Sequence, residues 1–329
     1  MRIKNKEIAH SDIKFYILLS PTKIRTNAMH NLVWKFTKIL SIVKKNLMNV
    51  LDEHGNLTRP GNKPKFSDAE VITLSLLSEA LMFDSEYYLF KVLNKNFKAE
   101  FPNLIDRSGY NRRRKNLHRL TEIVWRSLVT QLTFGEDTFV IDSMPIQICK
   151  FSRAKRSRVC RDRYETAPDY GFCAAQNQTY FGYKLHGLAS LIGVITDFEL
   201  TKANVADIHY LQEIKYRYSA CTILGDKAYL NNPLQTELFE EHRILLNTPM
   251  RKNQKNYRKQ PAIFRKSRKR IETVFSQFCG QFKIQTNYAK QFDGFATRLM
   301  AKIAAFTLLQ FLNIFEFGRE LNHVKHTLI

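Results

Sequence analysis

Three acidic residues occupy positions from which a carboxylate can reach into a cleft. Asp142 and Asp226 follow two short apolar runs, residues 138–141 and 221–224, each of which predicts a buried strand. Glu272 lies inside a segment whose pattern predicts a helix. An acid at the end of a buried strand is poorly placed for a surface ion pair, because the apolar run holds it at the edge of an interior sheet. We therefore treat these three carboxylates as candidates for catalysis.

Metal-assisted transfer of a phosphodiester is the chemistry that suits three carboxylates. This reaction uses two divalent cations about 3.5–4 Å apart, which serve the attacking and the leaving oxygen. Mg²⁺ prefers oxygen ligands and keeps some waters, so two or three convergent carboxylates are enough. Asp142, on the central predicted strand, suits the position between two ions, and Asp226 and Glu272 suit the flanks. Arg268 precedes Glu272 by four residues, so we expect both on one helical face, where Arg268 can hold a phosphate.

The segment that must position these acids begins near residue 135. From there short apolar runs alternate with amphipathic stretches, which is typical of a sheet flanked by helices. We predict strands over residues 138–141, 180–189, 193–200, 221–224 and 244–246, and helices over 205–216, 233–241, 263–282 and 295–317. This order predicts an α/β catalytic domain over residues 135–329 with a ribonuclease H-like fold, namely a mixed five-stranded sheet with flanking helices.

Residues 1–134 are expected to form a mostly helical N-terminal region that binds DNA. Ser67 and Glu70 have the spacing of a capping box before an apolar run, which predicts a helix over residues 68–83. Two further helices are predicted over residues 85–97 and 117–133. No helix-turn-helix spacing is evident in this region.

The charge of the chain points to nucleic acid as the partner. Its 52 Lys and Arg residues exceed its 30 Asp and Glu residues, which gives a formal net charge of +22. Residues 251–270 alone carry ten Lys or Arg and no acid, and they lead directly into the segment of Glu272. The candidate DNA contacts are Arg112, Arg113, Lys184, His186, Lys227, Arg265, Arg268 and Lys269.

Two pairs among these candidates have an equally good second interpretation. Arg112 and Arg113 either contact phosphates or belong to a solvated helix start. Lys184 and His186 lie on one face of a predicted strand beside the strand of Asp142, and they either contact DNA or have no special role. The sequence leaves both alternatives open.

The cysteine content and the apolar stretches indicate where in the cell the protein acts. The five cysteines are scattered and form no Cys-x-x-Cys pair, so neither a disulfide framework nor a zinc module is indicated, and a reducing cytoplasm, near the nucleoid, is expected. The late apolar stretch over residues 303–317 is shorter than the roughly 20 residues that span a membrane. We predict that it is a buried helix, with no membrane partner.

Five segments together resemble a known family. They are the capped helix that starts at Ser67, Asp-Ser-Met-Pro at 142–145, Gly-Tyr-Lys-Leu-His at 182–186, Gly-Asp-Lys-Ala-Tyr at 225–229 and Arg-Lys-Arg-Ile-Glu-Thr-Val-Phe at 268–275. In this order and spacing they are similar to blocks of the DDE transposases of bacterial insertion sequences, and most similar to the nine-eighty-two family of insertion elements. The resemblance covers roughly residues 30 to 315.

The resemblance implies a ribonuclease H-like catalytic domain, Mg²⁺ or Mn²⁺, and strand transfer of DNA by a homodimer on paired element ends. The chain departs from the wider pattern at two positions around the third acid, because Arg265 stands where tyrosine is expected and Cys279 where lysine is expected. The DNA-gripping role of that lysine then passes to Lys283 or Lys269. Two other functions stay open: a metal-dependent nuclease or resolvase of the same fold, and a DNA-binding remnant without catalysis. Asp207 is the acid most easily mistaken for a catalytic one, and we interpret it as an acid at a helix start.

Overall fold

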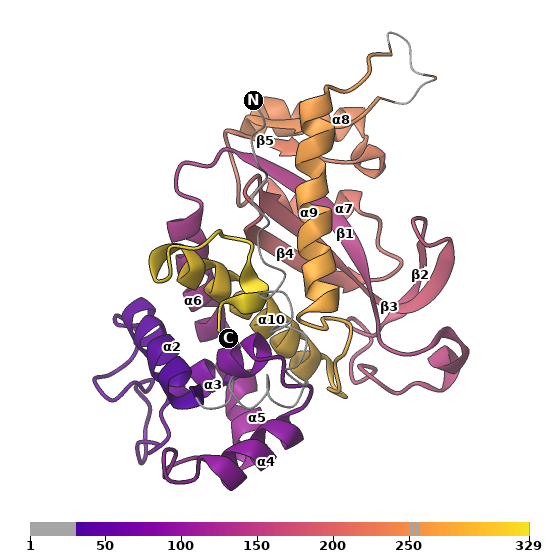
Figure 1. Cartoon of the computed structure of the whole chain (residues 1–329). Helices are drawn as coiled ribbons and strands as arrows, with labels where there is room; N and C mark the ends of the chain where they lie inside the picture. The colour runs from indigo at the N-terminus through magenta and orange to yellow at the C-terminus, as the bar shows by residue number, and fades with distance from the viewer. Residues whose placement is uncertain (1–30, 251–252, 254–256, 329) are drawn as a thin grey trace, which may run out of the picture.

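Helices fill one part of the molecule and a mixed sheet the other (Figure 1). The computed structural model describes residues 31–250, 253 and 257–328, so residues 1–30, two stretches of the basic segment (251–252 and 254–256) and residue 329 lie outside it. Part of the expected N-terminal region and part of the basic run over 251–270 are therefore outside the described residues.

The helical part contains the predicted helices within a few residues. Its helices are α2 (Leu32–Asn46), α3 (Asp68–Ala80), α4 (Glu86–Asn96), α5 (Arg107–Asn116) and α6 (His118–Leu132). The capping box is confirmed, because the Ser67 hydroxyl accepts from the Glu70 amide at 3.2 Å and the Glu70 carboxylate accepts from the Ser67 amide at 2.6 Å. The basic segment that contains Arg112 and Arg113 is a helix of its own, α5.

The sheet lies in the second part of the chain. Its strands are β1 (Thr138–Gln147), β2 (Asp169–Cys173), β3 (Gln178–Ser190), β4 (Ile195–Lys202), β5 (Cys221–Leu224) and β6 (Ile244–Asn247). The remaining helices are α7 (Ile208–Ile214), α8 (Asn232–His242), α9 (Ala262–Gly280) and α10 (Phe292–Phe315), with short 3-10 turns at η1 (Phe151–Arg156), η2 (Lys227–Tyr229) and η3 (Val324–His326). The strand order is β2-β3-β1-β5-β6, and β4 also pairs with β3.

The sheet is mixed, as expected, but it has six strands rather than five. β3 runs antiparallel to β1, β2 and β4, whereas β5 is parallel to β1 and β6 is parallel to β5. The strand missed by the sequence pattern is β2, which pairs with the first five residues of β3, residues 178–182. Its side chains alternate between half-buried and exposed, so it lacks the apolar run on which strand prediction depends.

β1 corrects a second expectation, because Asp142 lies in the middle of this strand and not at its end. The strand continues through Ser143 to Gln147, and Met144 and Ile146 keep the alternating burial of a strand. Pro145 stands within it, although proline cannot donate to a ladder. The position is tolerated because β5 pairs with β1 only as far as Val140, so this part of β1 is paired with β3 on one side alone.

The two faces of the sheet are covered by different helices. On one face Ile141 and Leu188 belong to a buried cluster with residues of α7 and α8, such as Tyr210 and Leu238. On the other face Val140 belongs to a larger cluster with residues of α9, α10 and the N-terminal helices. Since side chains alternate along a strand, neighbouring residues of β1 face different helices.

α10 lies in the larger core. It packs mainly against α6 and α3, so a helix from the end of the chain lies among helices from its beginning (Figure 1). By length and apolar composition it is the one helix in the described ranges that could cross a membrane, but 83% of its most apolar window is buried inside the protein. This burial agrees with the predicted core helix. The division of the chain at residues 134 and 135 stays a proposal.

Candidate active site

Pairing between β1 and β5 brings the first two acids level with each other. Thr138, Phe139 and Val140 pair with residues 222, 223 and 224 of β5, a constant offset of 84 positions. The same offset carried past the last pair sets Asp226 opposite Asp142. The two strands are parallel and β5 ends at Leu224, so Asp226 follows the end of β5 beside the part of β1 that contains Asp142.

A glycine brings the third acid to this place. Gly187 of β3 pairs directly with Asp142, so the two residues face the same side of the sheet. A Cβ atom at Gly187 would lie 3.2 Å from the Phe275 ring and 3.7 Å from the Ile271 side chain, both of α9. The missing side chain therefore lets α9 pack closely on the sheet at the position that pairs with Asp142. Figure 1 shows α9 lying against the sheet. Glu272 follows Ile271 and is exposed at the margin of this contact.

The electrostatics of Asp142 connect all three acids. Burial is the largest cause that raises the pKa of the Asp142 carboxyl, which is about 6, and the neighbouring charges of Asp226 and Glu272 act in the same direction. The Ser143 amide, which donates to this carboxylate at 2.8 Å, and the charge of Arg268 both lower the pKa. A half-buried carboxylate among two like charges is a position that a cation stabilises.

The three carboxylates are suitable ligands for divalent metal ions, although they do not form a complete metal-binding site by themselves. Three carboxylates are hard oxygen donors of the kind that Mg²⁺ and Mn²⁺ prefer. Asp226 is fixed by the Ala228 amide, which donates to it at 2.7 Å and leaves its second oxygen available. Within the described part of the chain, however, no three acidic, histidine or cysteine side chains lie close enough to hold one ion together.

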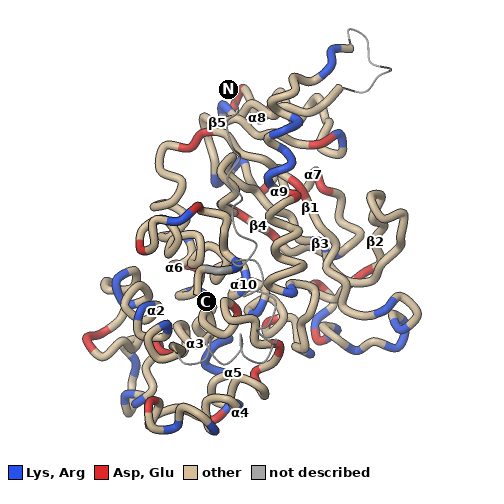
Figure 2. The backbone as a smooth tube through the Cα atoms, viewed as in Figure 1, with Lys and Arg blue, Asp and Glu red and all other residues tan. Residues whose placement is uncertain are grey.

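The basic candidates on α9 and beside Asp226 lie around these acids. Arg268 is half-buried and Arg265 and Lys269 are exposed on α9, and Lys227 is exposed immediately after Asp226. None of the four side chains has a hydrogen-bond or ion-pair partner among the described residues. Figure 2 shows Lys and Arg along the first half of α9, above the acidic positions of the sheet. These cations are therefore free to meet an anionic substrate.

Lys184 and His186 lie on the opposite face of the sheet. They pair with Pro145 and Ser143, which point away from the side of Asp142. His186 is completely buried, its Nε2 atom lies 2.8 Å from the Thr201 hydroxyl, and burial lowers its pKa to about 4. The Lys184 ammonium donates to the Val205 carbonyl at 2.8 Å and pairs with Asp207 at 3.1 Å. The predicted direct contact of His186 with DNA is wrong because its side chain is enclosed, and Lys184 is occupied by the start of α7.

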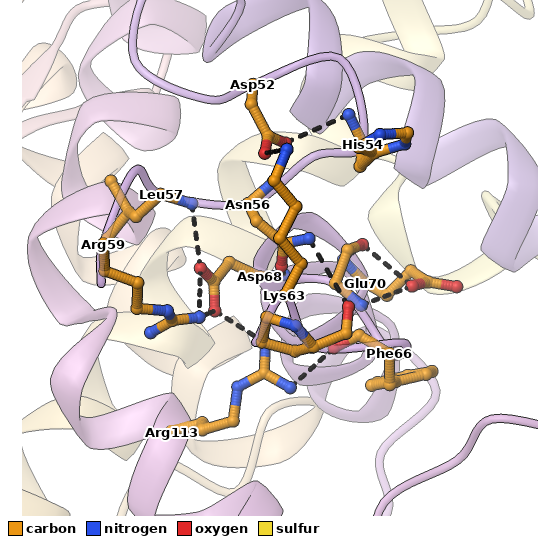
Figure 3. Close-up of polar contacts among 12 residues, drawn as sticks. Asp52, His54, Asn56, Leu57, Arg59, Lys63, Phe66, Asp68, Glu70 and Arg113 are labelled. Atoms are coloured by element: carbon orange, nitrogen blue, oxygen red, sulfur yellow. Dashed lines mark hydrogen bonds and ion pairs between the residues drawn. The ribbon is translucent and has the colours of Figure 1, made fainter. Parts of the chain in front are cut away.

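Arg113 is also occupied by the protein itself (Figure 3). Its guanidinium donates to Asp68 at 2.6 Å and to the Phe66 carbonyl at 2.6 Å. Asp68 is fully buried at the start of α3 and also pairs with Arg59 at 2.8 Å. Arg113 therefore joins α5 to α3, which favours a structural role for this side chain, and its contact with DNA stays a prediction. Arg112, its neighbour, is exposed and has no partner in the described ranges, so it is still a candidate.

Two residues near the acids, Gly187 and Tyr229, were not identified from the sequence as part of the site. Gly187 was missed, although a glycine inside a predicted strand is a signal of close approach. Tyr229 is buried with no hydrogen-bond partner for its hydroxyl among the described residues, and burial together with the charges of Asp207, Asp142 and Asp226 raises its pKa. Asp207 contacts Lys184 and lies 3.6 Å from His186, which ties it to α7 rather than to a metal.

Lys283, one of two residues expected to replace the missing lysine at Cys279, is engaged elsewhere. Its ammonium pairs with Asp84 at 2.7 Å, in the connection between α3 and α4. Of the two expected substitutes, Lys269 alone remains beside Glu272.

Comparison with known proteins agrees with this geometry. A family model described as the transposase DDE domain matches residues 133–308, a range that contains the sheet and all three acids. No curated protein and no solved structure matches the chain. Because the matched range covers more than half of the sequence and carries the acids at the end of β5, along β1 and on α9, the chain belongs to the transposase DDE-domain family.

Proposed function

We propose that this protein is a transposase that cuts DNA at the ends of a mobile element and joins the freed 3′-hydroxyl to target DNA. The observation that carries the proposal is the position of three acids from three separate elements, since the charges of Asp226 and Glu272 act, after burial, to raise the pKa of Asp142. We also propose two finer assignments. The five predicted strands have a ribonuclease H-like arrangement, and the protein belongs to the nine-eighty-two family of bacterial insertion elements.

Asp142, Asp226 and Glu272 are proposed to hold two Mg²⁺ or Mn²⁺ ions, with Asp142 shared between them. When bound, such ions activate the attacking oxygen and stabilise the charge on the leaving oxygen. The raised pKa of Asp142 supports this role, because its carboxylate lies among like charges and gains most from a nearby cation. The Ser143 and Ala228 amides fix the orientation of Asp142 and Asp226 by hydrogen bonds at 2.8 and 2.7 Å.

The chain's own cations are proposed to orient the DNA. Arg268 is the first of them, since it lies one helical turn before Glu272 and its charge is felt by Asp142. It would hold the phosphate next to the scissile bond, while Arg265, Lys269 and Lys227 would bind phosphates on either side. Phosphate contacts of this kind fix the position of the duplex without reading its sequence. No covalent bond between protein and DNA is needed.

The partners follow from the reaction. The DNA substrates are the terminal inverted repeats of the element and its target, and two ends must be held together, so we propose a homodimer on paired ends. Arg112, exposed on α5, would contribute to binding by the N-terminal region over residues 1–134. The compartment proposed is the cytoplasm, next to the nucleoid, with no role for a membrane.

The decisive experiment measures cleavage and joining of DNA that carries the inverted repeats flanking the gene. The wild-type protein is compared with Asp226→Asn and Glu272→Gln, with and without Mg²⁺ or Mn²⁺. Asp207→Asn is the matched control, because it removes the same charge from an acid that contacts Lys184 on the other face of the sheet. We expect joined product from wild type and Asp207→Asn, and none from the other two variants, which should still bind DNA.

Each other outcome changes the assignment. Metal-dependent cleavage without any joined product would favour a nuclease or resolvase of the same fold. DNA binding without cleavage by the wild-type protein would favour a remnant that has lost catalysis. Full activity of Asp226→Asn would show that the second acid lies elsewhere, and loss of joining by Asp207→Asn in the same assay would then point to Asp207.

A further inference from the structure

A second basic site lies away from the three acids. A cavity of about 670 Å³ opens between α4, α5 and the segment that connects α9 to α10, and none of the three acids lines it. Figure 1 shows α4 and α5 at the opposite end of the molecule from β5 and α8. The cavity is therefore a separate feature.

The floor of this cavity is neutralised by internal pairs. Arg114 pairs with Glu86 at 2.9 Å, and the Asn111 amide donates to the same carboxylate at 2.9 and 3.0 Å. Arg298 donates to Glu79 at 3.0 Å and to the Asp84 carbonyl at 2.8 Å. The charges of both guanidinium groups are therefore compensated by carboxylates of the protein, although the buried Nε atom of Arg114 has no hydrogen-bond partner among the described residues.

The rim, by contrast, carries cations that have no partner in the part of the chain that the structure describes. They are Arg107 and Lys115 of α5 and Lys290 of the segment before α10, and all three line the cavity. Glu86, already paired, is the one acid in the lining. Three unpaired cations around a compensated carboxylate give the opening a net positive potential that selects an anion.

Two exposed tyrosines stand at the same opening. Tyr87 at the start of α4 has 68% of its surface exposed and Tyr288 before α10 has 62%, although large aromatic side chains are usually buried. The segment that carries Tyr288 is held in place by two hydrogen bonds. The Cys160 backbone amide donates to the Lys290 carbonyl at 2.7 Å, and the Asn287 side-chain amide donates to the Phe295 carbonyl at 3.0 Å. Exposed rings among free cations are typical of surfaces on which unpaired bases stack while their phosphates are held.

The size of the cavity restricts the form of the nucleic acid. Its volume of about 670 Å³ lies within the range of roughly 300–1,000 Å³ that encloses one small ligand, so a nucleotide can enter but a duplex cannot. We propose that this cavity binds an unpaired nucleotide of DNA, with its base stacked on Tyr288 or Tyr87 and its phosphates held by Arg107, Lys115 and Lys290. The inference rests on the proposed function in one respect, that DNA is the substrate.

The test uses the full chain in EDTA, so that no cleavage occurs, and measures fluorescence anisotropy with a short single-stranded oligonucleotide. Tyr288→Ala should weaken binding about tenfold, because loss of one base–aromatic stack costs about 1.4 kcal/mol. Tyr288→Phe keeps the ring and should bind as wild type does. Lys290→Gln should lower the slope of log affinity against log salt by about 0.7, the value for one phosphate contact on a single strand. Lys98→Gln, the same charge change at an exposed lysine outside the cavity, should leave the slope unchanged.

Photo-cross-linking gives a readout that is independent of affinity. An oligonucleotide with bromodeoxyuridine in a single-stranded end should label Tyr288 or Tyr87, and the same base inside a blunt duplex should not. Equal affinity of all four variants, or labelling only on α9, would overturn the proposal. If Tyr288 is labelled but the protein never cleaves DNA, the nucleotide-binding cavity is supported and the proposed catalysis is contradicted. If the protein cleaves and joins DNA but all four variants bind the oligonucleotide with equal affinity, the proposed catalysis is supported and the nucleotide-binding cavity is contradicted.

Discussion

Replacing Asp142 by asparagine should stabilise the fold at neutral pH. Burial and two acidic neighbours raise the pKa of this carboxyl from 3.8 to about 6, a difference of about two pKa units. Each unit corresponds to about 1.36 kcal/mol, so the charged carboxylate destabilises the folded protein by about 3 kcal/mol. Asparagine has no charge and keeps an oxygen to accept from the Ser143 amide, which makes it the cleanest replacement.

The pH dependence has a definite sign. Because the folded protein holds this proton more tightly than the unfolded chain, it binds more protons between pH about 4 and about 6. The contribution of Asp142 to the free energy of unfolding of the wild-type protein therefore falls as the pH rises through that window. Asp142→Asn has no such carboxyl group, so its stability does not change for this reason. The stability advantage of Asp142→Asn should be near zero below pH about 4, grow up to pH about 6 and then stay constant. Contributions from other groups are common to both proteins and cancel in the difference.

Urea denaturation in EDTA at several pH values measures this difference. Asp137→Asn is the control, since it makes the same change at an exposed acid just before β1, and it should alter stability by less than about 0.5 kcal/mol at every pH. Adding Mg²⁺ should stabilise wild type more than Asp142→Asn, because the ion relieves the same repulsion. An advantage for Asp142→Asn that is absent at neutral pH, or that does not change between pH about 4 and 6, would refute the electrostatic account of this site.

Three further predictions test the packing around the site. Gly187→Ala should cost about 1–3 kcal/mol in thermal unfolding and reduce cleavage, because its methyl group meets the Phe275 ring, and Phe275→Leu should restore part of both. Arg113→Ala should lower the urea midpoint by loss of a partner of buried Asp68, whereas Arg112→Ala should leave it unchanged and weaken only DNA binding. The pKa of His186 is lowered from 6.5 to about 4, so stability should fall as the pH drops from about 6.5 toward 4, and its NMR resonances should not titrate near pH 6.5.

Much of this protein is determined locally in the sequence. The Ser67 capping box, the apolar runs before Asp142 and Asp226 and the long apolar segment of α10 each predict an element from a short stretch, because hydrophobic period and capping act over a few residues. The same runs did not indicate that β1 continues past Asp142, because its second half is paired with β3 alone and contains Pro145.

Tertiary structure decided which side of an element a residue faces. Lys184 and His186 point away from Asp142 because β3 pairs with β1 in one register, and a shift of one residue would have reversed their sides. Arg113 is half-buried against Asp68 and Arg112 is exposed, although they are neighbours, because the packing of α5 on α3 fixes the rotation of α5. Strand register and helix rotation depend on contacts between distant segments, so no local pattern in the chain records them.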